Sequence, residues 1–387
     1  MNNSFQVRKK REGYLGIYIH YPYCYHKCSY CDFYSIGIQD NKLDSEEILF
    51  ESYRKEILLR VQENPELNEL LVDTIFFGGG TPSKASPEKI RDLILFLRAN
   101  LKFDNSVEIS LEANPENIDS EYLERIHDAG INRLNVGIQS FQPKHLISLD
   151  RYFDSVQYEM VMERISSSKI SNIGIDLIFG IPNQTKEEFY EDVSKALDYR
   201  INHISLYSLT VEKGTEYSRK VSEKLSKPPE EELQVELLND LPKFLQEYNF
   251  YRYEISNYSK QDSESKHNLR YWMMENYIGI GPGAHGFLPK GRYSNPRNID
   301  SYLKEKFGRK YQESNFVIET SLNIFRLTSK IDLFSFFPNH KLTIQKIIEK
   351  FKSRGLCEFE QGVFQWKTDA ILYLDSHIEE IVMELGD

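Results

Sequence analysis

From Gly13 to Ser35 the chain runs GYLGIYIHYPYCYHKCSYCDFYS, an apolar segment followed at once by a group of cysteines. Cys24, Cys28 and Cys31 have the spacing C-x3-C-x2-C, and they are three of the 4 cysteines in 387 residues. Thiolates are ligands of zinc ions and of iron–sulfur clusters. This stretch therefore predicts a β-strand that leads into a metal-binding loop.

Three kinds of site are compatible with these cysteines. A closed zinc site needs a fourth ligand, which His26 would supply. Three buried structural thiols are the second alternative. The third is a [4Fe–4S] cluster held by three cysteines, with one iron open to a small ligand, as catalytic metal sites keep one position open. The missing fourth cysteine favours the third alternative without excluding the other two.

The first two thirds of the chain alternate between apolar segments and amphipathic ones, which predicts a parallel α/β fold. Polar or glycine-rich loops follow these strands, and because parallel strands end at one rim, we expect these loops to converge. The expected strands are 13–21, 72–80, 106–115, 132–141, 172–182 and 203–215, and the expected helices include 86–101, 119–130 and 185–200.

The composition shifts near Ser301. A helical pattern at 343–355 precedes a hairpin-like segment at 356–367 and a last helix, which predicts a smaller α+β, winged-helix-like domain. Within it, Cys357 is expected to be a small buried apolar residue. The predicted division is an N-terminal tail (1–12), a core domain (13–250), a connecting segment that lines the site (251–300) and the C-terminal domain (301–387).

Charge and composition exclude several classes of function. The net charge is −11 and the only basic run is RKKR at 8–11, so a nucleic-acid partner is not expected. The N-terminus has no apolar signal region, and no run approaches ~18 apolar residues, so no transmembrane segment is expected. We expect a cytoplasmic protein with reduced thiols.

The cysteine spacing, with Tyr30 just before the last cysteine, resembles the radical SAM superfamily. This resemblance implies a partial parallel (β/α)6 barrel of radical SAM type. It also implies a [4Fe–4S] cluster on Cys24, Cys28 and Cys31 whose open iron binds S-adenosylmethionine. In that superfamily the cluster reduces the sulfonium and a 5′-deoxyadenosyl radical forms. The resemblance leaves open whether this chain cleaves the cosubstrate.

The resemblance also implies roles for residues beyond the cysteines. The GGGTPS segment at 78–83 would place bare backbone against the methionine end of the cosubstrate. Glu112 would accept hydrogen bonds from the ammonium group. Each of three residues also has an ordinary alternative. Glu112 would be a solvated carboxylate at a strand end, Arg151 would form a surface ion pair, and Tyr18 would be part of the core. The implied cosubstrate contacts are Tyr18, Tyr30, Gly79, Gly80, Thr81, Glu112, Gln139, Arg151 and Asp176.

Asp176 lies in an otherwise apolar segment, so a buried polar partner is expected for its carboxylate.

Further motifs are most similar to the oxygen-independent coproporphyrinogen oxidase-like family, and within it to haem chaperones of the HemW type. These include YEISNYS (253–259), HNLRYW (267–272) and GIGPGAHGF (279–287). The dehydrogenases of this family carry another cysteine where Phe33 stands, and a long arm where this chain has about a dozen residues. The resemblance therefore implies a chaperone that binds haem and delivers it to haem proteins, which include membrane-associated recipients.

The HNLRYW segment carries the haem expectation. His267 would be an axial ligand, with Tyr271 and Trp272 as stacking surface, because neutral imidazole is a good ligand for haem iron. The alternative is a turn-capping histidine with two core aromatics. His285 is a second candidate contact. Relatives often carry a cysteine at Ser265, which argues against a thiolate ligand here.

Relatives often carry a histidine two residues after Arg151, where this chain has Phe153.

Two other functions remain open at this point. One is an oxidative decarboxylase of coproporphyrinogen III, and the other is a zinc-stabilised binding protein. The sequence also leaves open whether the chain forms a homodimer.

Overall fold

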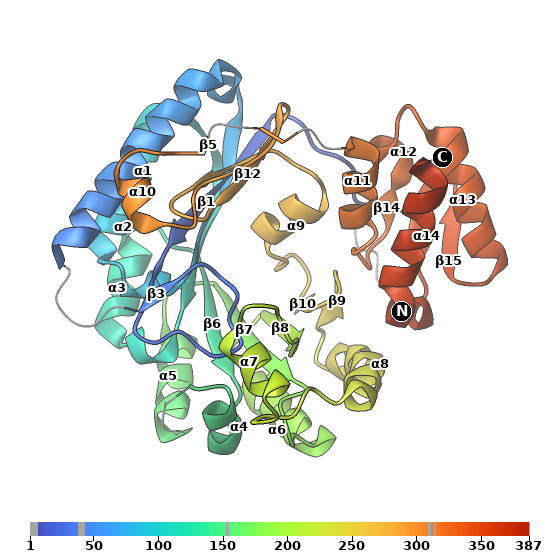
Figure 1. Ribbon diagram of the computed structural model, residues 1–387, viewed down its shortest axis with the longest axis horizontal. Helices are drawn as coiled ribbons and strands as arrows, with labels where there is room; N and C mark the ends of the chain where they lie inside the picture. The colour runs from blue at the N-terminus through green and yellow to red at the C-terminus, as the bar shows by residue number, and fades with distance from the viewer. Residues whose placement is uncertain (1–6, 38–42, 152–154, 309–310, 313–314, 387) are drawn as a thin grey trace.

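The computed structural model describes residues 7–37, 43–151, 155–308, 311–312 and 315–386. Its main feature is one large, mostly parallel β-sheet (Figure 1). In spatial order the strands are β13 (Gly291–Ser294), β12 (His285–Leu288), β11 (Tyr277–Ile280), β1 (Tyr14–Tyr21), β4 (Leu71–Gly79), β5 (Lys102–Ala113), β6 (Arg133–Gln139), β7 (Asn172–Phe179), β8 (His203–Ser208), β10 (Asn257–Ser259) and β9 (Tyr251–Arg252).

All six strands predicted from the apolar segments are confirmed, and they are neighbours in the sheet. The strands β1, β4, β5, β6, β7 and β8 pair in parallel, each with the next. β11 adds a further parallel strand beside β1, and antiparallel strands complete both edges. Parallel strands connected by helices must all end at the same rim, so this order places the six following loops on one side of the molecule.

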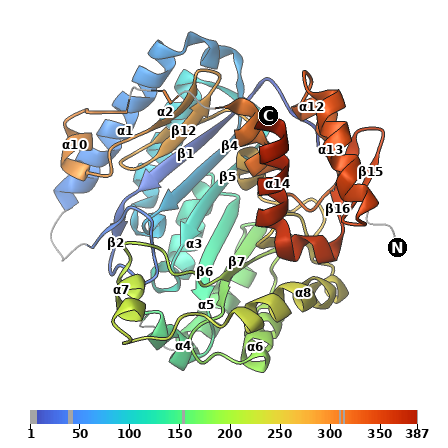
Figure 2. The ribbon, with the colours of Figure 1, turned by 45° about the vertical axis from the view of Figure 1, so that its right-hand side comes forward.

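Helices cover one face of this sheet (Figures 1 and 2). One of them, α6 (Lys186–Leu197), begins with a capping box: Thr185 Oγ1 accepts from the Glu188 backbone N–H, and Glu188 Oε2 accepts from that of Thr185. The helices of this part of the chain are α1 (Leu43–Glu63), α2 (Pro87–Asn100), α3 (Ser120–Asp128), α4 (Pro143–Ser148), α5 (Ser155–Ser167), α6 (Lys186–Leu197), α7 (Glu216–Ser222) and α8 (Glu231–Glu247).

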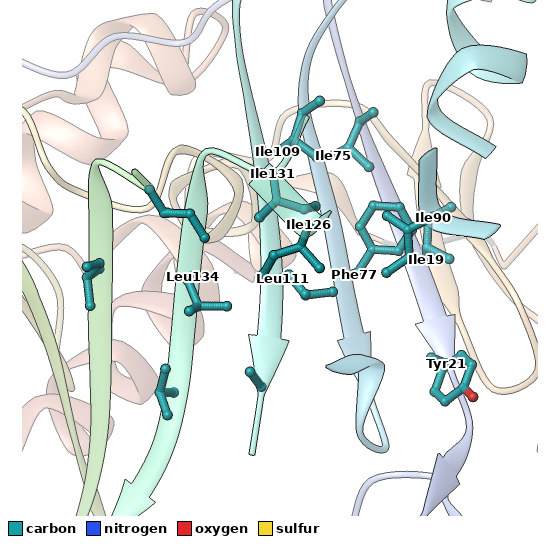
Figure 3. Close-up of a cluster of buried hydrophobic side chains, with 14 of the residues drawn as sticks. Ile19, Tyr21, Ile75, Phe77, Ile90, Ile109, Leu111, Ile126, Ile131 and Leu134 are labelled. Atoms are coloured by element: carbon teal, nitrogen blue, oxygen red, sulfur yellow. The ribbon is translucent and has the colours of Figure 1, made fainter. Parts of the chain in front are cut away.

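The main core lies between the sheet and these helices. Apolar side chains of alternate strand positions are buried there with helix residues such as Ile90 and Ile126 (Figure 3). In β1, Leu15, Ile17 and Ile19 are fully buried on this face, and Tyr18 projects from the opposite one. The opposite, concave face is therefore left for polar and aromatic side chains.

The connecting segment 251–300 contributes strands to both edges of the sheet and the short helix α9 (Lys266–Trp272). In Figure 1, α9 lies between the sheet and the C-terminal region. A side chain at Gly16 of β1 would collide with Arg270 of α9, because a Cβ there would stand 2.4 Å from Arg270 Cδ. Arg270 pairs with Asp73 at the start of β4, which fixes the helix against the concave face.

The C-terminal region has its own core and a small antiparallel sheet, ordered β14-β16-β15. Cys357 is buried in this core, as predicted. We propose that the C-terminal region is a winged-helix-like unit. The basis is the order of its elements, which is a helix, a strand, two helices, a hairpin and a last helix. The elements are α11 (Phe316–Ile324), β14 (Ile331–Asp332), α12 (Leu333–Phe336), α13 (Lys341–Ser353), β15 (Cys357–Glu360), β16 (Val363–Trp366) and α14 (Leu374–Gly386), and α10 (Ile299–Leu303) precedes them.

The start of the chain lies against this C-terminal region. Arg8 pairs with Ile331 as an isolated bridge, and its backbone N–H donates to the Lys330 carbonyl at 2.8 Å. Leu269 and Met273 of α9 are buried in the same C-terminal core.

Among the residues described, no helix combines the length and the apolar character that crossing a membrane requires.

Candidate functional site

A cavity of about 650 Å³ opens at the carboxyl ends of the six parallel strands. It is lined by residues from the loops after β1, β4, β5 and β8, by Arg151 between β6 and β7, and by residues of β6 and β7 themselves. The predicted convergence is confirmed for these loops, whereas residues 180–185 after β7 are not among the lining residues. Of the predicted site residues, it contains Cys24, Cys28, Cys31, Tyr30, Gly79, Gly80, Thr81, Glu112, Gln139, Arg151 and Asp176.

The cysteine loop is closed at its base by a short pair of strands. β2 (Tyr23–Cys24) pairs in parallel with β3 (Ile36–Gly37), so the two ends of the loop lie side by side. Within the loop, the Cys31 backbone N–H donates to the Cys28 carbonyl at 3.2 Å. The loop therefore presents all three cysteines to one cavity.

The thiols lie among groups that donate toward sulfur. Thr81 Oγ1 donates to Cys24 Sγ at 3.4 Å, and Arg151 Nη1 donates to Cys28 Sγ at 3.9 Å. Burial raises the pKa of Cys24, and it raises the pKa of Cys31 to about 11. Without a bound cation, burial therefore favours the protonated form of the Cys24 and Cys31 thiols; a coordinated cation reverses this preference.

The glycine segment after β4 packs tightly against the start of the cysteine loop. The Gly80 backbone N–H donates to the Tyr21 carbonyl at 2.7 Å, and that of Thr81 to the Tyr23 carbonyl at 2.9 Å. A Cβ at Gly80 would stand 2.9 Å from three backbone atoms of residues 21–23, and Gly79 has φ +110°. Glycine is thus required here by the chain's own contacts, and both residues also line the cavity.

Two carboxyl groups form the inner part of the cavity. Glu112, near the end of β5, accepts from the Gly79 backbone N–H at 3.2 Å. Burial and the nearby charge of Asp176 raise the pKa of Glu112 to about 8, and burial raises the pKa of Asp176 to about 6. The Ser205 side chain interacts with the Asp176 carboxyl and lowers its pKa against the effect of burial, while the buried Oδ1 atom accepts no hydrogen bond from any described residue.

Arg151 crosses the cavity wall. Its Nη2 donates to the Gly137 carbonyl at 2.6 Å, and both Nη atoms lie 3.3 Å from Asn114 Oδ1. It therefore does not form the surface ion pair that was its alternative. Gln139 stands at a register shift between β6 and β7 and has φ 68°, which turns it from the strand direction toward the cavity. Phe153 lies outside the described residues.

Two predicted site residues, Tyr18 and His267, lie beneath the cavity and not among its lining residues. The Tyr18 hydroxyl is 3.1 Å from His20 Nδ1, and its ring stacks with those of Phe76 and His267. His267 is fully buried, with Nδ1 2.8 Å from Thr74 Oγ1 and Nε2 2.9 Å from the Tyr271 hydroxyl. Haem ligation by His267 stays a prediction; it requires these contacts to open.

The other residues considered for haem binding lie in α9, at its N-cap or on β12. Trp272 is half-buried, and the guanidinium of Arg326 lies over its ring at 5.1 Å. Ser265 is the N-cap of α9, where its hydroxyl accepts from the Asn268 backbone N–H at 3.3 Å. His285 is exposed on β12.

The cavity residues that sequence reasoning did not assign include Asn114, Asn135 and Tyr207. Asn114 lies in the quoted EANPE segment, and Asn135 is a polar residue within an apolar strand, so both left a signal. Asn135 Oδ1 is buried and accepts no hydrogen bond from any described residue. Tyr207 left no such signal, because an aromatic residue in a strand is usually part of the core.

Comparison with known proteins places this site in a family. The model of the radical SAM superfamily matches residues 18–196. The heme chaperone HemW of Buchnera aphidicola subsp. Acyrthosiphon pisum is 35% identical over 354 residues, which are 88% of this chain and 89% of that protein. HemW of Lactococcus lactis subsp. lactis is 31% identical over 378 residues, 96% of this chain and 94% of that protein.

Among solved structures, the coproporphyrinogen III oxidase HemN of Escherichia coli has the same fold. The TM-score is 0.79 at 18% identity, and the match covers 96% of this chain and 90% of that one. The identity is too low to carry more than the fold. The sequence identity to the two HemW proteins is the evidence for the family: the chain belongs to the HemW family of the radical SAM superfamily.

Proposed function

We propose that this protein is a haem chaperone that holds a [4Fe–4S] cluster and S-adenosylmethionine in the cavity and binds haem for delivery to haem proteins. The observation that carries the proposal is the similarity to HemW of Lactococcus lactis along 96% of the chain. Membership of the radical SAM superfamily implies the cluster and the cosubstrate. The proposal that the protein binds haem rests on its relatives, which are named heme chaperones.

The cysteine loop fits such a cluster. Cys24, Cys28 and Cys31 supply three thiolates on one side of the cavity. Thr81 and Arg151 donate toward two of the sulfurs, which favours the anionic ligand set that a cluster requires. When bound, the cluster supplies an electron for reductive cleavage of the cosubstrate's sulfonium.

The opposite wall fits S-adenosylmethionine. The unpartnered Oδ1 atoms of Asp176 and Asn135 offer buried acceptors, and a buried acceptor without a partner is costly unless a ligand or water fills the site. Glu112, held by the Gly79 N–H, would accept from the ammonium group. Tyr30, Gln139 and Arg151 would contact the nucleoside and carboxylate ends, while Gly79, Gly80 and Thr81 would border the methionine end.

One feature favours a chaperone over a decarboxylase. Phe33, at the place of the dehydrogenases' further cysteine, is 64% exposed and lines the cavity. It supplies no further thiolate there. The proposed partners are haem and recipient haem proteins.

The test is anaerobic reconstitution followed by iron and labile-sulfide analysis and a haem titration monitored at the Soret band. The proposal predicts about four irons and four sulfides per chain and a saturable Soret shift. The triple variant Cys24→Ala, Cys28→Ala, Cys31→Ala should lose the iron–sulfur absorbance, with Cys357→Ala as the control that keeps it. Zinc without sulfide would identify a zinc-stabilised binding protein. Consumption of coproporphyrinogen III without haem binding would identify a dehydrogenase.

A further inference from the structure

The HNLRYW helix is joined to the cavity by a layer of stacked rings. The His267 ring stacks on Phe76 of β4, with centroids 5.2 Å apart and an interplanar angle of 24°, and on Tyr18 of β1 at 6.4 Å and 28°. Phe76 and Tyr18 stack on each other at 6.2 Å and 24°. The three rings come from three different elements and form one layer inside the sheet's concave face.

This layer lies directly beneath the predicted cosubstrate contacts. A Cβ at Gly78 would be 2.9 Å from Phe76 Cε1, 3.0 Å from Tyr18 Cε2 and 3.1 Å from Glu112 Oε2. Both rings therefore touch the start of the glycine segment at the point where the Glu112 carboxylate also touches it. A shift of the rings would move the backbone on which Glu112 is held.

The same layer continues to the cysteine loop. The Tyr18 hydroxyl lies 3.1 Å from His20 Nδ1, and His20 Nε2 lies 2.8 Å from the Tyr34 carbonyl. Because a carbonyl can only accept, Nε2 of His20 carries the proton and Nδ1 accepts from Tyr18. Tyr34 follows the third cysteine of the loop by three residues. One chain of contacts thus runs from α9 to the loop that carries the cysteines.

His267 is fixed on every side of its ring. Thr74 Oγ1 lies 2.8 Å from His267 Nδ1 and accepts from Arg270 Nε at 3.3 Å, while His267 Nε2 lies 2.9 Å from the Tyr271 hydroxyl. Its backbone N–H also donates to Glu108 Oε1 at 3.3 Å. With both ring nitrogens engaged and the side chain fully buried, no lone pair of this imidazole is available to an iron ion.

We infer that His267 is a positioning residue for the S-adenosylmethionine pocket, acting through Phe76 and Tyr18, and that it does not ligate haem. This inference rests on the proposed binding of S-adenosylmethionine and is independent of haem binding. If His267 were an axial ligand, its replacement would weaken haem binding; if it positions the pocket, its replacement weakens S-adenosylmethionine binding. One set of variants therefore decides between the two roles.

The experiment measures two affinities in anaerobically reconstituted protein: S-adenosylmethionine by isothermal titration, and haem by Soret absorbance. His267→Ala and Phe76→Leu should each weaken S-adenosylmethionine binding about 10-fold, the usual effect of removing a supporting contact. Both should also reduce the change that S-adenosylmethionine causes in the electron paramagnetic resonance spectrum of the reduced cluster. Haem affinity should not change.

His145→Gln is the matched control, because His145 is equally buried but lies on α4, where it contacts Glu188. If His267→Ala does not fold, Thr74→Val and Phe76→Leu carry the test, since each removes one contact of the same layer. Loss of the haem Soret shift with an unchanged S-adenosylmethionine affinity in His267→Ala would overturn the inference. So would an unchanged S-adenosylmethionine affinity in Phe76→Leu. Failure of the wild type to bind haem would remove the chaperone proposal but leave this test intact.

Discussion

The raised pKa of Glu112 predicts that S-adenosylmethionine binds with a steep pH dependence. Burial, assisted by the charge of Asp176, places this pKa at about 8, so most of the carboxyl is protonated at pH 7 in the free protein. The ammonium of the cosubstrate needs the ionised form as its acceptor. Affinity should therefore rise with pH until the cosubstrate's own amine, with an α-amino pKa of ~7.7–8.0, loses its proton.

The size of the effect follows from the two titrations. Between pH 6.5 and 7.5, the ionised fraction of a carboxyl with a pKa of about 8 rises roughly 8-fold, while the protonated fraction of the amine falls by about a quarter. The net expectation is an affinity increase of about 6-fold. Asp176, with a pKa of about 6, is mostly ionised throughout this range.

Isothermal titration at a series of pH values measures this increase directly, and two buffers of different ionisation enthalpy report the proton released on binding. Glu112→Gln should bind more weakly and show a slight fall over the same range, because only the amine still titrates. A wild-type affinity that stays constant from pH 6.5 to 7.5 would refute the assignment of Glu112 as the ammonium acceptor.

The remaining predictions concern stability. Because burial raises the Glu112 pKa to about 8, the folded state keeps this proton while the unfolded state releases it, so stability falls as pH rises from about 4.5 to about 8. Glu112→Gln should therefore raise the melting temperature at pH 8 by ~2 °C or more without ligand, and an unchanged value would contradict the shift. Gly80→Ala should lower the free energy of unfolding, measured in urea, by about 2 kcal/mol and should lower cluster occupancy. Gly37→Ala is the control: a Cβ there would have no atom within 4 Å, so stability should change by less than ~0.5 kcal/mol. Arg270→Met should cost about 3–5 kcal/mol because it leaves buried Asp73 and Glu275 with Arg11 alone, while Arg125→Met at an exposed pair should change the unfolding midpoint little. Equal effects of the two arginine variants would contradict this account of the buried network.

Local signals in the sequence were sufficient for the parallel part of the fold. The strands are rich in apolar residues because one face packs against the helices, while residues such as Asn135 of β6 and Asp176 of β7 face the cavity. The loops after them could be assigned to one rim by topology alone. That step gathered Cys24, Glu112 and Asp176 into one cavity, although they are far apart in the sequence.

Other features depend on contacts that no local signal encodes. The edge strands of 251–300 are only 2–4 residues long, too short for a periodic pattern. The bridge between Arg8 and Ile331 joins opposite ends of the chain. Tyr18 and His267 were predicted as ligand contacts because motif spacing does not report depth; the stacking with Phe76 that places them beneath the cavity arises only in the folded sheet.

The most direct test of the chaperone proposal is haem transfer from the loaded, reconstituted protein to an apo haem protein, followed by stopped-flow absorbance. A chaperone that delivers haem by contact predicts a transfer rate that rises with acceptor concentration and exceeds the rate of spontaneous haem dissociation. A rate that equals spontaneous dissociation at every acceptor concentration would show passive haem release and contradict the proposed function.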